Sequence, residues 1–522
     1  MVSILQKMRL AHRPEVPDRL RKLPQLSFHQ MPASSSIPDS IKKRFPQTHG
    51  LNAWSVVEGK GKPDRELRVG VLFSGGQAAG GHNVISGLFD GLQQIHSDCK
   101  LIGFLNGPAG LIDGKFQELS ASMVDSVRNL GGFDLIGSGR TKIETPEQFE
   151  SAAQQVKTHS LDAVVIIGGD DSNTNAALLA EYFLQNQIKA SVIGVPKTID
   201  GDLRSADIEI SFGFDSATKT YSELIGNIAR DAISAKKYYH FIKLMGRSAS
   251  HIALECALAT HPNLTLIGEE KQSLSQTVAA IADLIVERKN KGKEYGIILL
   301  PEGLIEFIPE FKDLIRACNQ LLADGKEPQK IRDFLAEPHR SFFVRLPEKI
   351  QQQLVLERDP HGNVRVSQIE TDLLVLDLVK KELDSRNVKF HALNHFFGYE
   401  GRSCFPSNFD ANYCYSLGLL ASLAIRESAT GVILAIKNLN RPVKDWEPKA
   451  VPIVQLMGFE MRSGKEKPVI AKALVDLQSR PYRYFAKMKK QWGLEDDYQM
   501  PGPIQFYGSS ELIDSVPITL SL

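Results

Sequence analysis

The chain has 522 residues, with 62 Lys or Arg against 61 Asp or Glu and a formal net charge of +1. This balance excludes a polybasic nucleic-acid binder and an acidic solvating tail. With 42% hydrophobic and 24% charged residues, the composition excludes general disorder and indicates a globular protein. At roughly 150 residues per domain, the length predicts about three or four domain-sized units.

The cysteines and the N-terminus indicate a reducing compartment. The five cysteines form no CxxC pair and no His/Cys cluster at zinc spacing, so neither structural zinc nor a disulfide framework is expected. Lys7, Arg9 and Arg13 interrupt the first apolar run before a signal-peptide core forms, and no stretch reaches the roughly 18 apolar residues of a membrane span. We expect a soluble cytoplasmic protein with no nucleic-acid or membrane partner.

The sequence pattern in the first half of the chain changes at Arg68. Residues 1–65 contain seven prolines and are predicted to form an extended N-terminal arm with short helices. Buried-strand runs then alternate with helical periodicity, as in RVGVLF, LDAVVIIGG, SVIGV, HFIKLMG and YGIILLPEG. Strands that alternate with helices are typical of mostly parallel α/β sheets. We assign residues 66–240 to a first α/β domain, joined by C-terminal segments, and residues 241–303 and 390–460 to a second.

The second half of the chain is less regular. Residues 304–389 lack strand runs and are charged and helix-prone, which predicts a helical insert. The polar segment HFFGYEGRSCFPSNFD is predicted to be a loop that leads into a long helix and the strand GVILAI. Residues 461–522 form a mixed C-terminal region. The predicted fold class is therefore α/β, with two Rossmann-like domains of mostly parallel sheet, an N-terminal arm and a helical insert.

Loops after predicted strands carry the chemistry, because ligands of open α/β sheets bind beyond the carboxyl ends of the strands. The first such loop, GGQAAGG, begins at Gly75 and Gly76 and opens a helix. Its backbone amides and the helix N-terminus suit a phosphate, although a tight turn without a ligand explains the loop equally well. The spacing differs from GxGxxG, and the chain contains no GxxxxGK[ST] motif, so a Walker-type NTPase is disfavoured.

Two further loops bring acids and a cation together. Asp170 and Asp171 follow Gly168-Gly169, and such a strand-end Asp can hold a Mg²⁺ ion that carries phosphate oxygens, with simple helix capping as an equal alternative. The loop from Pro196 to Asp202 holds one lysine, one threonine and two acids. A lysine beside two acids suits a site that binds phosphate and accepts a proton, whereas solvated turn charges are the weaker alternative.

A fourth group is dispersed along the chain. Met245-Gly246-Arg247 and Pro301-Glu302-Gly303 follow predicted strands, and Gly398-Tyr399-Glu400-Gly401-Arg402 follows the insert. Each segment alone has a structural explanation. Together they supply a hydroxyl-binding acid and phosphate-binding arginines, as a sugar phosphate requires.

In this order, the motifs GGQxxGGHN, GGDDSN, PKTIDGD, KKYYxFIKLMGR, PEG and GYEGR resemble the phosphofructokinase superfamily, and specifically its pyrophosphate-dependent long form. The resemblance spans about residues 66–450. It implies two α/β domains of phosphofructokinase type. It also implies an enzyme that uses Mg²⁺ and reversibly transfers a phosphoryl group from pyrophosphate to the 1-hydroxyl of D-fructose 6-phosphate, giving fructose 1,6-bisphosphate and phosphate.

The resemblance also implies roles for single residues. Gly75 and Gly76 lie against the pyrophosphate, Asp170 binds Mg²⁺, and Asp200 accepts the proton of the fructose 1-hydroxyl. Lys197, Thr198 and Arg247 are implied as further catalytic groups. The implied contacts to the sugar phosphate are Thr198, Ile199, Asp200, Met245, Gly246, Arg247, Glu302, Tyr399, Glu400, Gly401 and Arg402.

The donor is expected to be pyrophosphate rather than ATP. ATP-using relatives have a glycine where this chain has Asp171, and a carboxylate there repels the α-phosphate of a nucleotide. Lys197 can neutralise the compact pyrophosphate and stabilise the leaving phosphate. Asp202 is expected to support the metal side. The family's glycine loop has a proline where this chain has Ala79, which removes a φ restraint but no phosphate-binding group.

Lys237 and Tyr238 in the KKYY segment match positions that in the family reach the site of a neighbouring subunit. This match implies a homodimer or a higher homo-oligomer, with a solvated strand edge as the alternative. The size of the oligomer, the direction of the reaction, effectors, and the roles of the arm and the insert stay open.

Three alternatives remain at this point. An ATP-dependent phosphofructokinase is disfavoured by the sequences of the GGDD and PKTIDGD motifs. A non-catalytic regulatory subunit is disfavoured because it should lack Asp170 or Asp200, and both are present. An alternative acceptor such as sedoheptulose 7-phosphate stays open, since Glu302 and Arg402 read hydroxyl and phosphate groups rather than chain length.

Overall fold

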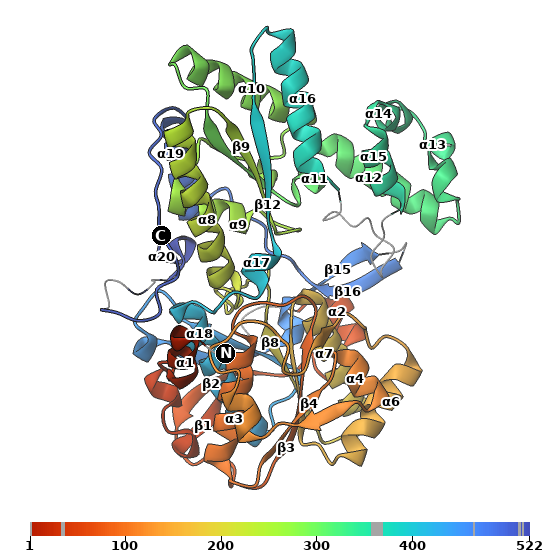
Figure 1. Cartoon of the computed structure of the whole chain (residues 1–522). Coiled ribbons are helices and arrows are strands. Elements are labelled where there is room, and N and C mark those ends of the chain that lie inside the picture. Colours follow the sequence, from red (N-terminus) through yellow and green to blue (C-terminus); the bar gives the residue numbers. More distant parts are fainter. Residues whose placement is uncertain (1–2, 33–36, 357–368, 463–464, 510–512, 514–515) are drawn as a thin grey trace.

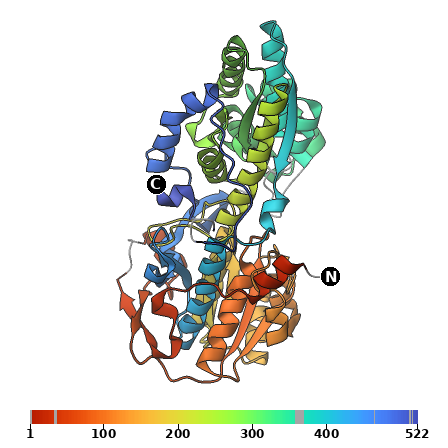
Figure 2. The same ribbon diagram turned by 60° about the vertical axis from the view of Figure 1, so that its left-hand side comes forward.

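The protein contains two main sheets stacked along its long axis, each covered by helices (Figures 1 and 2). One sheet has ten strands and the other has four, and a separate two-stranded ribbon lies close to both. The α/β fold class is therefore confirmed. The computed structural model describes residues 3–32, 37–356, 369–462, 465–509, 513 and 516–522.

The ten-stranded sheet has a parallel centre. Its order is β1-β2-β14-β13-β8-β7-β3-β4-β5, with β6 paired to β3. The neighbours β13, β8, β7, β3 and β4 run parallel to one another, whereas the outer pairings are antiparallel. The parallel strands are β3 (Arg68–Ser74), β4 (Lys100–Phe104), β6 (Ser138–Gly139), β7 (Ala163–Gly168), β8 (Ser191–Pro196) and β13 (Val432–Lys437).

Helices on both faces explain why these central strands are almost wholly apolar. Alternate residues of β3 and β7 pack into two separate cores, one on each face of the sheet. The first core lies under α3 (Gly81–Ile95) and α18 (Asn408–Arg426), and the second under α6 (Pro146–Thr158) and α7 (Asp170–Gln185). Shorter elements complete the rim, namely α4 (Pro108–Asp113), β5 (Phe116–Glu118) and α5 (Ala121–Asp125).

The N-terminal arm is more ordered than its prolines predict. It contains α1 (Ile4–Ala11) and α2 (Asp39–Arg44), and it also adds two strands, β1 (Leu26–Met31) and β2 (Ala53–Glu58), to the ten-stranded sheet. Both strands lie in segments without proline, and their buried side chains join the core. Arg426 at the end of α18 fixes the arm by donating hydrogen bonds to the backbone carbonyls of Leu23 (3.0 Å) and Leu26.

The four-stranded sheet is entirely parallel, in the order β10-β11-β9-β12. Its strands are β9 (Tyr239–Leu244), β10 (Leu264–Thr265), β11 (Gly296–Pro301) and β12 (Ala392–Phe397). The helices packed on its faces are α8 (Phe214–Ala235), α9 (His251–Thr260), α10 (Leu274–Asn290) and α16 (Thr371–Ser385).

Strand β12 corrects one expectation, because its residues overlap the segment predicted as a loop. β12 is an edge strand, and most of its side chains are partly exposed, so it lacks the apolar run that marks a buried strand. The short helix α17 (Tyr399–Arg402) follows it directly.

The chain crosses between the two sheets more often than the sequence indicates. Of residues 390–460, assigned above to the second domain, only β12 joins the four-stranded sheet, whereas β13 and β14 (Glu447–Pro452) pair within the ten-stranded sheet. A strand run does not reveal which sheet it enters, because pairing depends on distant partners.

The helical insert is present within residues 304–389. Before α16 it comprises α11 (Leu304–Phe307), α12 (Pro309–Ala323), α13 (Ile331–Phe334), α14 (His339–Arg345) and α15 (Glu348–Leu356). These helices share a core with α10 and α16 and lie beside the four-stranded sheet (Figure 1). Residues 357–368 of the predicted insert lie outside the described residues.

The C-terminal region contacts both halves of the molecule. The first unit is the ten-stranded sheet with its helices, and the second unit is the four-stranded sheet with its helices. The ribbon of β15 (Met457–Arg462) and β16 (Lys465–Ile470) lies near the first sheet, and α19 (Arg480–Leu494) packs beside the second, with α20 (Ile518–Ser521) close to α9 (Figure 1). Across the described ranges, no helix combines the length and apolar character needed to cross a bilayer.

Candidate active site

A polar cavity of about 130 Å³ lies at the carboxyl ends of β3, β7 and β8, where the two units face each other. Parallel strands direct their following loops to the same edge of a sheet, so motifs distant in sequence meet there. Eleven of the predicted site residues line this cavity: Gly75, Gly76, Asp170, Asp171, Lys197, Thr198, Ile199, Asp200, Asp202, Arg247 and Arg402.

The glycine loop lies directly against two cations. Lys197 Nζ donates a hydrogen bond to the Gly76 carbonyl at 2.7 Å. A Cβ atom on Gly75 would lie 3.1 Å from Lys197 Nζ, and one on Gly76 would lie 2.0 Å from Arg402 Nη1. Gly75 also has a φ of 89°, a conformation that favours glycine. The absence of side chains at these positions therefore lets the cations approach the loop.

Lys197 is buried, with 5% of its surface exposed. Burial, together with the neighbouring guanidinium groups of Arg402 and Arg140, lowers its pKa to about 7, although the carboxylates of Asp200 and Asp170 partly offset these effects. The lysine thus changes its charge near neutral pH, and an anion bound beside it would favour the protonated form.

Carboxylates form the opposite wall of the site. Asp170 is the first residue of α7, and Asp200 and Asp202 lie in the loop after β8. Asp202 is 5% exposed, and burial together with the charges of Asp200 and Asp170 raises its pKa to about 7. Such crowding of acids is eased by a cation, and Mg²⁺ binds through one or two carboxylates together with phosphate oxygens and water. The donor set therefore fits Mg²⁺, although no group of three or more His, Cys, Asp or Glu at metal-binding spacing occurs within the described residues.

The second unit contributes the wall beyond β9. The carboxylate of Glu302, which is 2% exposed, accepts the Gly246 N–H at 3.0 Å, and burial raises the pKa of Glu302. Arg402 Nε donates to Met245 Sδ at 2.9 Å, which directs this arginine toward the glycine loop. Met245, Gly246 and Glu302 thus lie around Arg247 and Arg402 without lining the cavity themselves.

The GYEGR turn packs tightly against α8. Tyr221 on α8 donates a hydrogen bond to the Gly398 carbonyl at 2.6 Å, and a Cβ on Gly401 would lie 2.5 Å from the Tyr221 ring. Tyr399 is 71% exposed and, like Glu400, does not line the cavity.

Lys237 and Tyr238 are not brought into the cavity. They lie between the end of α8 and the start of β9, and Tyr238 is 38% exposed. Their predicted role in a neighbouring subunit's site is not tested by a single chain.

The chain belongs to a known family. A family model described as Phosphofructokinase matches residues 68–425, more than half of the chain. This chain is a member of the phosphofructokinase family. The predicted resemblance is thereby confirmed, and the matched range begins at the first residue of β3.

Two full-length relatives carry the same name. A pyrophosphate–fructose 6-phosphate 1-phosphotransferase from Treponema pallidum is 49% identical over 559 residues, covering 100% of this chain and 97% of that protein. A protein of the same name from Entamoeba histolytica is 47% identical over 541 residues, covering 100% of this chain and 99% of that protein. The crystal structure of a pyrophosphate-dependent phosphofructokinase from Nitrosospira multiformis matches with a TM-score of 0.57 at 16% identity, over 87% of this chain and 96% of that chain. This last likeness concerns the phosphofructokinase fold alone.

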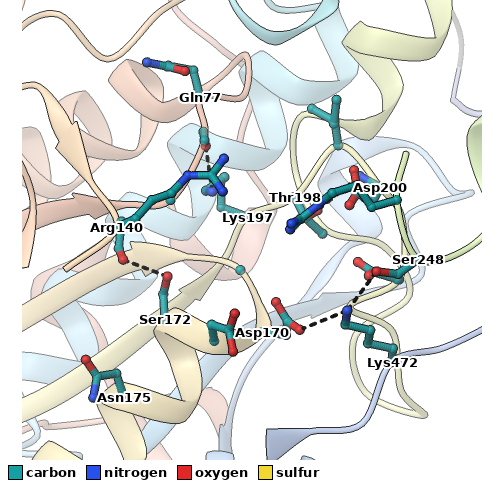
Figure 3. Close-up of a pocket in the computed structure, with 18 of the residues that line it drawn as sticks. Gln77, Arg140, Asp170, Ser172, Asn175, Lys197, Thr198, Asp200, Ser248 and Lys472 are labelled. Atoms are coloured by element: carbon teal, nitrogen blue, oxygen red, sulfur yellow. Dashed lines mark hydrogen bonds and ion pairs between the residues drawn. The ribbon is translucent and has the colours of Figure 1, made fainter. Parts of the chain in front are cut away.

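The phosphofructokinase site also contains residues that the sequence analysis missed. Arg140 and Lys142 follow the short strand β6, and Lys142 forms an ion pair with Asp171 at 3.2 Å. Lys472 follows β16, beyond the range of the family match, and points toward Asp170 and Ser248 (Figure 3). The segment GSGRTK offered a signal in its two glycines and two cations, whereas nothing in the local sequence marks Lys472.

The buried charge of Lys197 generates a prediction about stability. The unfolded chain holds this proton up to pH 10.5, the ordinary value, whereas the folded chain releases it near 7. Burying the charged lysine therefore lowers the free energy of unfolding by its full amount below pH 7, and this effect disappears above about pH 10.5. We expect Lys197→Met to raise the free energy of unfolding by about 1–3 kcal/mol at pH 6, because removing the buried charge stabilises the fold by more than the lost hydrogen bond to Gly76 destabilises it.

Urea unfolding at pH 6 and pH 9 measures this effect, which should be smaller at pH 9. The exposed Lys189→Met serves as the control and should change little at either pH. A loss of stability in Lys197→Met at both pH values would contradict the prediction.

Proposed function

We propose that this chain catalyses the reversible, Mg²⁺-dependent transfer of a phosphoryl group from pyrophosphate to the 1-hydroxyl of D-fructose 6-phosphate. The products are fructose 1,6-bisphosphate and phosphate. The observation that carries the proposal is one small cavity in which the glycine loop and Lys197 face Asp170 and Asp200. The names of the full-length relatives support pyrophosphate as donor and fructose 6-phosphate as acceptor.

On this proposal, catalysis rests on positioning and charge. The glycine-loop amides and Lys197 hold the pyrophosphate, and Lys197 stabilises the charge that develops on the leaving phosphate. Asp200 accepts the proton of the 1-hydroxyl as the oxygen approaches phosphorus in line. Asp170, with Asp202 nearby, would hold Mg²⁺, which when bound offsets the negative charge of the phosphate oxygens. Thr198 accepts the Asp200 N–H through its hydroxyl at 3.1 Å and so orders this loop.

The acceptor is proposed to lie on the side of the second unit. Arg247 and Arg402 present guanidinium groups to the cavity and suit the 6-phosphate, which they can bind through paired hydrogen bonds. The buried carboxylate of Glu302 lies next to them and suits a sugar hydroxyl. The remaining proposed contacts are Thr198, Ile199, Met245, Gly246, Tyr399, Glu400 and Gly401.

Asp171 is proposed to exclude ATP. It lies on the cavity wall beside Asp170 and forms an ion pair with Lys142. A nucleotide would bring its α-phosphate close to this carboxylate, and like charges at close range cost several kcal/mol. Pyrophosphate has no third phosphate and avoids that contact.

We also propose that the enzyme is a homodimer or larger homo-oligomer of the cytoplasm. Lys237 and Tyr238 lie outside the cavity of their own chain, which fits a contribution to a neighbouring site. The edge strand β12 exposes Leu393 and Phe396 by 43% and 40%, as an interface between copies would require. None of the five cysteines, which all lie within the described residues, forms a disulfide, and this fits a reducing compartment.

The direct test is an assay of the purified chain with fructose 6-phosphate and Mg²⁺, supplied separately with pyrophosphate and with ATP. Pyrophosphate should give fructose 1,6-bisphosphate, and Asp200→Asn should lower kcat about 10²- to 10⁴-fold while KM values change little, because the proton acceptor is lost. The exposed Asp98→Asn is the control. Turnover with ATP and none with pyrophosphate would refute the proposal.

The donor proposal predicts a change of specificity. Asp171→Gly, alone or with Lys197→Gly, should raise kcat/KM for ATP at least about 100-fold, because the repulsion of the α-phosphate is removed. Asp171→Asn removes the charge but keeps the bulk, so it separates repulsion from crowding. If the folded variants gain no ATP use, Asp171 does not select the donor.

The shared-site proposal predicts complementation between two inactive variants. Asp200→Asn chains and chains with Lys237→Ala and Tyr238→Ala should each be nearly inactive alone. After co-expression, mixed dimers contain one intact site, so about a quarter of wild-type activity should return. A solution mass measured on each sample reports assembly. A fully active monomer, or no recovery in mixed oligomers, would count against the proposal.

A further inference from the structure

A short backbone segment, residues 471–475, joins the two units directly beside the cavity. We name it the strap. The Ala473 N–H donates to the Asp202 carbonyl at 2.7 Å, in the loop after β8. On the other side, the Ala473 carbonyl accepts a hydrogen bond from His251 Nε2 at 2.9 Å, and the Val475 N–H donates to Glu269 Oε1 at 2.9 Å. The strap is therefore held by residues of both units at once.

Lys472 is the residue that this strap directs into the cavity. The ammonium group of Lys472 donates to Ser248 Oγ at 2.7 Å and lies 4.0 Å from Asp170 Oδ2. Ser248 follows Arg247, which belongs to the proposed acceptor side of the cavity (the acceptor wall), whereas Asp170 belongs to the pyrophosphate side (the donor wall). Lys472 therefore lies where these two walls meet. The side chain of Lys472 is 32% exposed, which leaves the ammonium accessible from the cavity.

The geometry leaves Lys472 with hydrogen-bonding capacity to spare. An ammonium group has three N–H donors. Within the described ranges one is used, by Ser248, while the distance to Asp170 exceeds that of a hydrogen bond. Figure 3 places Lys472 and Lys197 on different sides of Asp170. An anion bound at Asp170 through a metal would thus have one lysine on each side.

We propose that Lys472 is a pyrophosphate-binding residue of the active site, placed there by the strap. This inference rests on the proposed function and extends it to a residue that lies outside the residues 68–425 matched by the family model. Lys197, beside the glycine loop, holds the donor on one side, and Lys472 holds it on the side of the second unit. The competing role for Lys472 is that of a counter-ion for Asp170 that never contacts the substrate.

The two roles differ in what a charge-removing variant changes. A ligand contact supports pyrophosphate binding specifically, so Lys472→Gln should raise KM for pyrophosphate roughly 10- to 100-fold, as expected for a lost charge-assisted hydrogen bond. KM for fructose 6-phosphate should change less than about twofold. Lys472→Arg keeps the charge and should recover most of the loss. A counter-ion would instead leave KM for pyrophosphate unchanged at saturating Mg²⁺.

Calorimetric titration with pyrophosphate and Mg²⁺ gives a readout that does not depend on turnover. The dissociation constant should rise in Lys472→Gln by the same factor as KM, and thermal unfolding establishes that each variant is folded. Lys467→Gln is the matched control, since Lys467 lies on β16, pairs with Glu144 at 3.5 Å and is not a cavity-lining residue.

Each outcome decides the proposal. Equal increases in both KM values, or an unchanged dissociation constant in Lys472→Gln, would overturn it, because the strap would then only hold the units together. If Lys472→Gln does not fold, Lys472→Met, which also removes the charge, decides by the same ratio of the two KM values. Wild-type protein that binds pyrophosphate without transferring its phosphoryl group would refute the proposed function but leave the binding test of Lys472 intact.

Discussion

The site depends on charges of opposite sign that are held together away from water. Burial alone destabilises the charged form of Lys197 and of Asp202, and the pKa of each moves to about 7 from opposite directions. The acids and the cations stabilise each other's charged forms, since the acids favour the protonated lysine and the cations favour the ionised acids. The rest of the architecture serves this balance. The glycine loop removes side chains that would separate the charges, and the parallel strands deliver both walls to one edge of the sheet.

The sequence predicted the parts of the site that follow buried strands. Asp170 and Lys197 lie within two residues of the end of an apolar strand, and Asp200 lies in the loop that follows β8. Strand ends therefore led to residues that line the cavity, and the order of the motifs identified the family. Arg140 was missed because β6 has two residues and gives no strand signal. Lys472 was missed because hydrogen bonds to distant residues, and not its own neighbours in sequence, bring it to the cavity. The strand β12 was missed for a different reason, because its position at the edge of the sheet leaves no apolar pattern to recognise.

The two units are connected by buried polar groups as well as by apolar packing. Asp410 at the start of α18 is fully buried and accepts the N–H groups of Gly213 and Ser216, where α8 begins. Because α8 then extends beneath the four-stranded sheet, this carboxylate fixes the direction of a helix shared by both halves. Together with the strap, it limits how far the donor wall and the acceptor wall can separate. Such contacts suit chemistry that needs two reactants in line.

The edge of the ten-stranded sheet beyond β8 unites the two ends of the chain. The strands β1, β2, β13 and β14 all fall outside the residues matched by the family model, two before them and two after, yet they are consecutive in the sheet. The segments at the two ends of the chain therefore form one structural unit. A fragment limited to residues 68–425 would expose the apolar edge of β8, and an unprotected edge of this kind is a template for aggregation. The family's core in this chain is therefore not a domain that can be isolated by trimming its ends.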